Sequence, residues 1–175
     1  MKTERLNIRL IEENDWPRIR QIWIDFSNSE YVYYDTWKDT SAEAVRLRVA
    51  RWAVAAREGT DHIFYAVCLD EAVIGYISLN IRDRGYELGY GFLNSCQGHG
   101  YAKESISAVL SGIKRPGIEK IYAGTAMKNI PSVRLLNRLC FELKGTEKLA
   151  FHKDESGNEI WFDGGIFELT LSTAN

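Results

Sequence analysis

A glycine-rich loop, residues 97–103, is the segment with the clearest chemical potential, and it lies between a predicted strand and a predicted helix. Gly98 and Gly100 have no Cβ, so the main chain can turn its N–H groups toward a ligand. The helix start adds unpaired donors and roughly half a positive charge. Together these features predict a cradle for a phosphate or diphosphate. The candidate cradle residues are Gln97, Gly98, His99, Gly100, Tyr101, Ala102 and Lys103.

Several kinds of glycine loop compete for this position. A P-loop requires Gly-x4-Gly-Lys-Ser/Thr, which the chain lacks. A dinucleotide fingerprint requires a third glycine where the chain has Lys103, and it follows the first strand of a βαβ unit, whereas a strand meander precedes this loop. Two interpretations remain, a loop for the diphosphate of coenzyme A and a glycine turn that only joins two elements.

Further motifs follow one another in a fixed order around this loop. Residues 87–93 read ELGYGFL, Asn129 and Ser132 are three positions apart, and residues 135–141 read LLNRLCF. With the QGHGYA loop, this set resembles the GNAT superfamily of acetyl-CoA-dependent N-acetyltransferases. The resemblance is closest to the branch that contains the ribosomal-protein alanine N-acetyltransferases, and it covers nearly the whole chain. The opening TERL with Arg9, and Asp163 before an apolar strand, fit the same branch.

The resemblance implies how acetyl-CoA would be held as the cosubstrate. The amides of residues 98–102, with Gln97, would bind the diphosphate. His99 stands where relatives often have Lys or Arg, and Lys103 could supply the missing charge.

The resemblance also implies where the rest of the cosubstrate would lie. Main chain near Phe92 and Leu93 would pair with the pantetheine arm where the fourth and fifth strands diverge, and an N–H there would bind the thioester carbonyl. Asn129 would hydrogen-bond the arm, and Ser132 would lie near the sulfur.

The implied reaction is direct attack of a primary amine on the thioester in a ternary complex. A base is needed because an amine with a pKa of about 8–10 is mostly protonated at pH 7. Glu87, on the strand beside the expected thioester, is the leading candidate, acting through water; an exposed or ion-paired strand carboxylate is the structural alternative. Asp35, Asp83 and His152 are weaker candidates.

A proton donor for the leaving thiolate is less obvious from the sequence. Many relatives outside this branch have a tyrosine acid four residues after the Ser132 position, and this chain has Leu136 there. The donor must therefore be Ser132, a water molecule or another residue, and the resemblance favours Ser132. The missing tyrosine keeps open an alternative function, a CoA-binding regulatory module without turnover.

Aromatic residues gather between the first two predicted helices, where the resemblance places one wall of the acceptor pocket. Such rings suit an amine through apolar contact and cation–π attraction. The alternative is packing of a long loop on the core. The candidate acceptor-binding residues are Trp23, Tyr31, Tyr33, Tyr34 and Glu87. The acceptor is expected to be a small-molecule amine or a protein N-terminus.

Alternation and helical periodicity outline the scaffold for these residues. Strands are predicted at residues 6–10, 63–67, 73–81, 86–93, 118–126, 142–152 and 159–171. Helices are predicted at residues 15–26, 41–59, 102–113 and 131–140. This order indicates one α/β (α+β) domain over residues 1–175, with a mixed, largely antiparallel central sheet flanked by helices.

Composition excludes several other classes. The 22 Lys and Arg against 24 Asp and Glu argue against a nucleic-acid binder, and no apolar run is long enough for a membrane span. Three cysteines without a CxxC pair and no apolar leader favour a cytoplasmic protein. The three histidines have no metal-ligand spacing, so no metal site is expected. A homodimer is a further possibility because the last two strands could present an edge for pairing.

Overall fold

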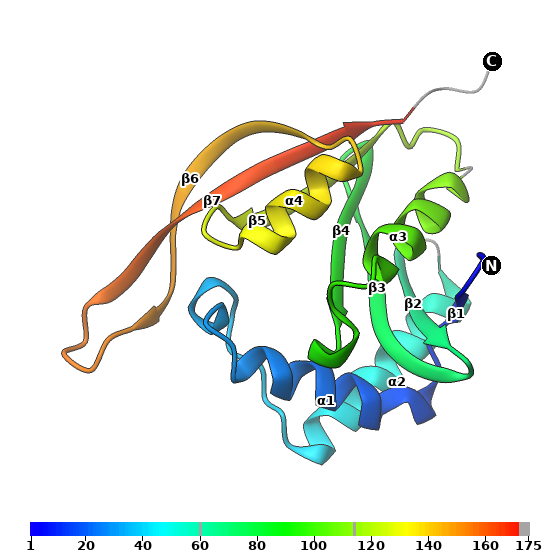
Figure 1. Ribbon diagram of the computed structural model, residues 1–175, viewed down its shortest axis with the longest axis horizontal. Coiled ribbons are helices and arrows are strands. Elements are labelled where there is room, and N and C mark those ends of the chain that lie inside the picture. The colour runs from blue at the N-terminus through cyan, green and yellow to red at the C-terminus, as the bar shows by residue number, and fades with distance from the viewer. Residues whose placement is uncertain (60, 114, 172–175) are drawn as a thin grey trace.

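A seven-stranded sheet forms the centre of the computed structural model, which describes residues 1–59, 61–113 and 115–171 (Figure 1). The strand order is β1-β2-β3-β4-β5-β7-β6, and every neighbouring pair is antiparallel except β4 and β5. The mixed α/β class with a largely antiparallel sheet is thereby confirmed. The strands are β1 (Asn7–Leu10), β2 (His62–Leu69), β3 (Ala72–Arg82), β4 (Gly85–Phe92), β5 (Lys120–Ala126), β6 (Glu142–Lys153) and β7 (Glu159–Thr170).

Four α-helices in the described residues cover the sheet on both faces. Local signals explain their starts: Pro17 lies in the first turn of α1, the Ser41 side chain accepts a hydrogen bond from the Ala44 amide, and Asn129 caps α4. The helices are α1 (Trp16–Ser27), α2 (Ala42–Glu58), α3 (Tyr101–Ser111) and α4 (Ile130–Arg138). The part of the chain that the structure describes also contains three short 3-10 helices that were not predicted: η1 (Glu13–Asp15), η2 (Val32–Tyr34) and η3 (Asn94–Cys96).

Two apolar layers hold the helices to the sheet. One layer joins α1 and α2 to Phe64, Ala66 and Cys68, while the other joins α3 and α4 to strand residues that include Val67. Successive side chains of β2 therefore enter opposite layers. This burial on both faces explains why the predicted strand is a continuous apolar run rather than an alternating one.

The pairing between β4 and β5 is short. Their parallel ladder joins Gly85 to Lys120, Tyr86 to Ile121 and Glu87 to Tyr122, and then ends. Beyond these pairs, β5 stays paired with β7 while β4 stays paired with β3. The two strands thus diverge toward the start of α3, which is the arrangement that the sequence resemblance implied.

The last two strands form a long hairpin that projects beyond the helices, with β6 at the edge of the sheet (Figure 1). The hairpin is fastened to η2: Nε2 of His152 lies 2.7 Å from the Asp35 carbonyl oxygen. His152, one of the weaker candidates for the base, is partly buried and holds this contact. Among the described helices, none has the length and apolar character to cross a membrane.

Candidate active site

The glycine loop has the backbone geometry of a cradle. Gly98 and Gly100 have φ angles of +79° and +81°, which favour glycine, and α3 begins at Tyr101. A Cβ added at Gly98 would meet no atom within 4 Å, so the loop faces open space there. The open space, the positive φ angles at two glycines and the unpaired N–H groups at the start of an 11-residue helix together suit the binding of a diphosphate.

The N-terminal segment braces this loop from outside. Nη1 of Arg5 donates a 3.1 Å hydrogen bond to the His99 carbonyl, and the guanidinium lies 4.7 Å from the centre of the Tyr101 ring. Arg5 also forms a 2.6 Å ion pair with Glu104 in the first turn of α3. The loop is therefore held in place by side chains that leave its amides available.

Side chains of the loop bond mainly to the loop itself. Nδ1 of His99 lies 2.8 Å from the Gln97 carbonyl, and the His99 ring stacks on Tyr101. Gln97 donates from Nε2 to the Asn94 side chain, at 2.9 Å. Lys103 is exposed on α3. The main-chain amides, more than the His99 and Gln97 side chains, are thus the groups free to bind an anion.

The end of β4 offers one N–H group toward the gap rather than two. The Leu93 amide donates to the Ile74 carbonyl at 3.0 Å and is thereby committed to β3. Amides of adjacent strand residues point in opposite directions, so the Phe92 amide is directed away from β3 toward the gap. Of the two predicted residues, Phe92 is therefore the one whose main-chain N–H is directed toward the gap and could bind the thioester carbonyl.

The start of α4 lies on the other side of the gap, where Ser132 meets β4. The side-chain oxygen of the N-cap Asn129 accepts the Ser132 amide at 3.2 Å, while the Asn129 NH₂ group is the donor that could face a ligand. Ser132 Oγ lies 2.7 Å from the hydroxyl of Tyr90 on β4. Burial raises the pKa of the Tyr90 phenol, and its hydrogen bond to Ser132 acts in the opposite direction.

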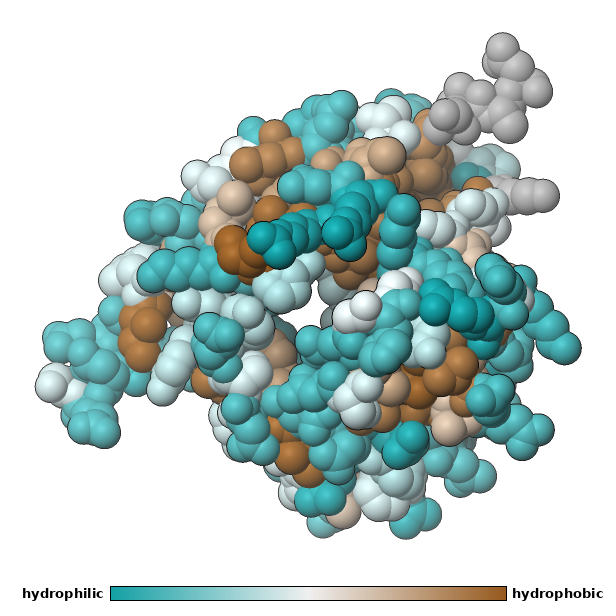
Figure 2. Space-filling view, viewed as in Figure 1, coloured by the Kyte–Doolittle hydropathy of each residue, from teal (hydrophilic) through white to brown (hydrophobic). Residues whose placement is uncertain are grey.

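Glu87 lies where β4 and β5 separate, because its pairing with Tyr122 is the last of their ladder. Its neighbours Tyr86 and Leu88 are buried in the α3–α4 layer, so the exposed Glu87 side chain projects from the opposite face. On that face a Cβ at Gly89 would lie 2.6 Å from the Ser78 hydroxyl, which explains the small residue. Figure 2 shows an opening through the molecule in the region where Figure 1 draws β4, α4 and the chain after α1.

The aromatic segment after α1 is built against the hairpin. The Tyr34 ring centre lies 5.2 Å from that of Phe162 on β7, and the Tyr33 ring meets His152 edge-on at 5.7 Å. Tyr31 packs against Tyr34, at 6.4 Å between ring centres. These three tyrosines therefore form one wall on the same side of the sheet as α1.

Trp23 is not part of this wall. Its side chain is 3% exposed, it packs edge-on against Trp52, and its indole N–H donates to the Tyr76 hydroxyl at 3.4 Å. Burial raises the pKa of Tyr76 to about 12. Trp23 thus belongs to the α1–α2 core layer, and the proposed contact with an acceptor is withdrawn.

The other acidic candidates lie in turns or loops of the chain. Asp35 forms an ion pair with Lys38, and Asp83 has a φ of +49° in the β3–β4 turn. Leu136, at the position where a tyrosine acid was sought, is fully buried. Among the candidate acids and bases, Glu87 and Ser132 are therefore the two beside the gap.

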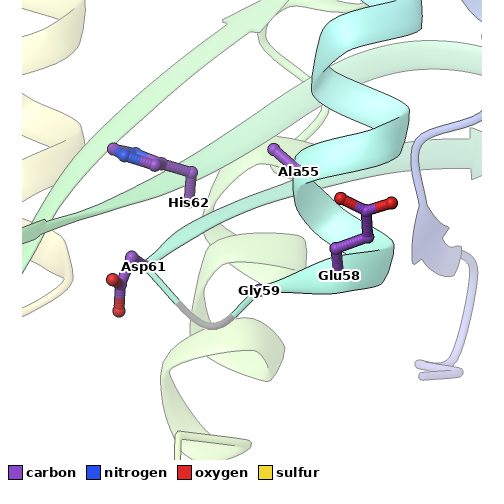
Figure 3. Close-up of a pocket in the computed structure, with 5 residues that line it drawn as sticks. All are labelled: Ala55, Glu58, Gly59, Asp61 and His62. Atoms are coloured by element: carbon purple, nitrogen blue, oxygen red, sulfur yellow. The ribbon is translucent and has the colours of Figure 1, made fainter.

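A separate cavity of about 310 Å³ lies between the end of α2 and the start of β2 (Figure 3). In Figure 3, the side chains of Asp61 and His62 extend away from Glu58 and do not converge on one point. Asp61 is also paired with Arg115, at 3.0 Å. In the part of the chain that the structure describes, no group of His, Cys, Asp or Glu could hold a metal ion.

Comparison with known proteins finds a family match over most of the chain. A family model described as "Acetyltransferase (GNAT) domain" matches residues 5–142. The uncharacterized N-acetyltransferase YnaD of Bacillus subtilis (strain 168) is 28% identical over 164 residues, which cover 91% of this chain and 90% of that protein. The family match includes the cradle, both strands beside the gap, and α4.

Solved structures share the fold. RimL, a ribosomal L7/L12 alpha-N-protein acetyltransferase in complex with coenzyme A, has a TM-score of 0.80 at 20% identity, covering 97% of this chain and 96% of that one. The ribosomal-protein-S5-alanine acetyltransferase from Vibrio fischeri has a TM-score of 0.78 at 18% identity, covering 97% and 95%. At these identities the likeness is one of fold.

Proposed function

The chain belongs to the GNAT acetyltransferase family, and we propose that it transfers the acetyl group of acetyl-CoA to a primary amine by direct attack in a ternary complex. One observation carries the proposal. The positive-φ glycine cradle lies at the start of α3, beside the β4 main chain that β5 leaves unpaired. A diphosphate and an extended amide-bearing arm would fit these two features at once.

The main chain would bind and orient the thioester. Amides of residues 98–102 would hold the diphosphate, with added charge from Lys103, and the Asn129 NH₂ group would donate to the arm. The Phe92 N–H would donate to the oxyanion that forms when an amine attacks. A preorganised donor of this kind lowers the barrier by about 3 kcal/mol.

Side chains of β4 and α4 would serve the amine and the leaving group. Glu87 would accept the amine proton through a water molecule, and the Ser132 hydroxyl would donate a hydrogen bond to the departing thiolate, which keeps the electron pair. The amine nitrogen forms a bond to the acetyl carbon while the carbon–sulfur bond breaks, with no covalent enzyme intermediate. Holding both substrates in this geometry supplies much of the acceleration.

The tyrosine wall supports the acceptor class. Tyr31, Tyr33 and Tyr34 present rings on the Glu87 side of the sheet, where apolar contact and cation–π attraction would hold an amine. The solved neighbours are named for acetylating ribosomal proteins. We therefore propose protein N-termini, as well as small-molecule amines, as candidate acceptors.

The proposal is tested by measuring thiol release from acetyl-CoA with a panel of N-terminal peptides, polyamines, amino acids and aminoglycosides. Release that depends on one class of amine is the expected result. A competing function is a CoA-binding module without turnover, which the buried Leu136 at the usual acid position favours. Thermal protection by CoA with no thiol release from any amine would establish that module instead.

Gly98→Val tests the cradle. The β-branched side chain is strained at a φ of +79° and projects into the space proposed for the diphosphate, so we expect CoA affinity to fall by at least about 100-fold. Gly157→Val is the matched control, because Gly157 has a φ of +84° and equally open surroundings in the β6–β7 turn. Calorimetric titration should show normal affinity for the control. Equal losses in both variants would mean that strain alone, not the cradle, governs binding.

A further inference from the structure

Two hydroxyl groups meet across the gap between β4 and α4. The Tyr90 hydroxyl and Ser132 Oγ are 2.7 Å apart, although the residues are 42 positions apart in the chain. Tyr90 is partly buried and its ring packs on the α3–α4 core layer, so the phenol oxygen has little freedom to move. The contact joins the two elements that flank the proposed thioester.

The direction of this hydrogen bond decides what Ser132 can do. A serine hydroxyl has one hydrogen to donate and two lone pairs to accept with. If Ser132 donates to Tyr90, its only hydrogen is spent and Ser132 has none left for the sulfur. If Tyr90 donates to Ser132, the serine hydrogen is left for the sulfur, and the two bonds reinforce each other.

We propose that Tyr90 is a positioning residue that donates its hydroxyl hydrogen to Ser132 and thereby aims the Ser132 hydroxyl at the leaving sulfur. The inference rests on the proposed acetyl transfer. It gives a positioning role to a tyrosine on β4, whereas many relatives outside this branch have a tyrosine acid on α4, at the position of the buried Leu136 in this chain.

The proton balance of this arrangement is simple. Glu87 receives the amine proton, the electron pair of the broken carbon–sulfur bond stays on sulfur, and the thiolate is finally protonated from solvent. Tyr90 keeps its proton throughout. The raised pKa of Tyr90 agrees with this role, because a phenol that resists ionisation remains a hydrogen-bond donor.

A double-mutant cycle separates positioning from general structural support. We expect Tyr90→Phe to lower kcat about fivefold and Ser132→Ala about tenfold or more, with less than a twofold change in KM for acetyl-CoA. Because Tyr90 acts through Ser132, the double variant should be no slower than Ser132→Ala. Tyr65→Phe, which removes another partly buried phenol of the same core layer, is the control and should keep wild-type kcat.

A second measurement does not need turnover. The ultraviolet absorbance of the thiolate reports the pKa of the CoA thiol when CoA is bound to the protein. Donation from Ser132 to sulfur lowers that pKa, so both Tyr90→Phe and Ser132→Ala should raise it, whereas Tyr65→Phe should not. The titration can be carried out even if no amine is acetylated. In that case the acetyl-transfer proposal fails, but the titration still shows whether Tyr90 orients the Ser132 hydroxyl.

Two results would overturn the inference. Additive losses of kcat in the double variant would mean that Tyr90 acts independently of Ser132. An unchanged thiol pKa in Tyr90→Phe would mean that Tyr90 does not influence the donor that faces sulfur.

Discussion

Glu87 is an exposed carboxylate, and it is the candidate general base because of its place on β4 beside the gap. It is the last β4 residue paired with β5, and its exposed side chain projects from the face of the sheet opposite the α3–α4 layer. We predict that Glu87→Gln lowers kcat/KM by about 100-fold and flattens its rise with pH, because an amide cannot accept the amine proton. The measurement is kcat/KM across the pH range with the best acceptor.

The matched control for this prediction is Glu159→Gln, which neutralises another exposed strand carboxylate, near the far end of the hairpin. It should leave the pH profile unchanged. A wild-type profile in Glu87→Gln would remove Glu87 as the base and leave water or the acceptor's own ionisation to explain the pH dependence.

At single residues, sequence reasoning succeeded where side-chain chemistry is local. The two loop glycines mark positive φ because no other residue adopts it as easily. The prediction that Trp23 contacts the acceptor failed, because periodicity predicts an apolar helix face without showing whether that face packs on the core or lines a pocket. Tyr90 was missed as a partner of Ser132 because a contact across 42 residues depends on how two distant elements come together.

Among the elements, the N-terminal segment and α3 are joined by one carboxylate. Glu104 accepts hydrogen bonds from the Thr3 hydroxyl and from Arg5, and these lower its pKa below the ordinary 4.5. A carboxyl with a lowered pKa in the folded state stabilises the fold above its unfolded pKa. That contribution disappears as the pH falls through the folded value.

We therefore predict a pH-dependent effect for Glu104→Gln. The variant should be less stable than wild type by up to about 1 kcal/mol near pH 7, since its Arg5 partner is 43% exposed and solvent weakens the pair. The difference should shrink as the pH falls below the ordinary carboxyl pKa, and it should vanish once the carboxyl is protonated in the folded state as well. Urea unfolding of both proteins near pH 7 and at successively lower pH tests this. A difference of the same size in acid would show that packing, not charge, is responsible.

The order of the strands and long helices along the chain could be predicted, because each element has its own hydrophobic period and its own end signals, such as Ser41 and Pro17. The divergence of β4 from β5 came from the resemblance alone, since register between distant strands leaves no local pattern. The register also decides that Phe92, and not Leu93, offers its amide to the gap.

For the molecule as a whole, the sheet consists of two halves that the short β4–β5 ladder joins. A ligand that binds only the folded state stabilises it by about 2.7 kcal/mol at 100 times its Kd. For a chain of 175 residues this predicts a rise in Tm of about 5–10 °C with saturating CoA. Calorimetric melting with and without CoA tests the prediction, and Gly98→Val should lose the rise. No shift in the wild-type protein would exclude a CoA site altogether.

The brevity of that ladder has a mechanical consequence. With three residue pairs between β4 and β5, main-chain bonds there offer little resistance to relative motion of the two halves. An acyl donor lodged along Phe92 and braced by α4 would couple them. The two halves of the sheet would then move less freely when an acyl donor is bound than when the site is empty. The contact between Tyr90 and Ser132 would be held most rigidly when the thioester is in place.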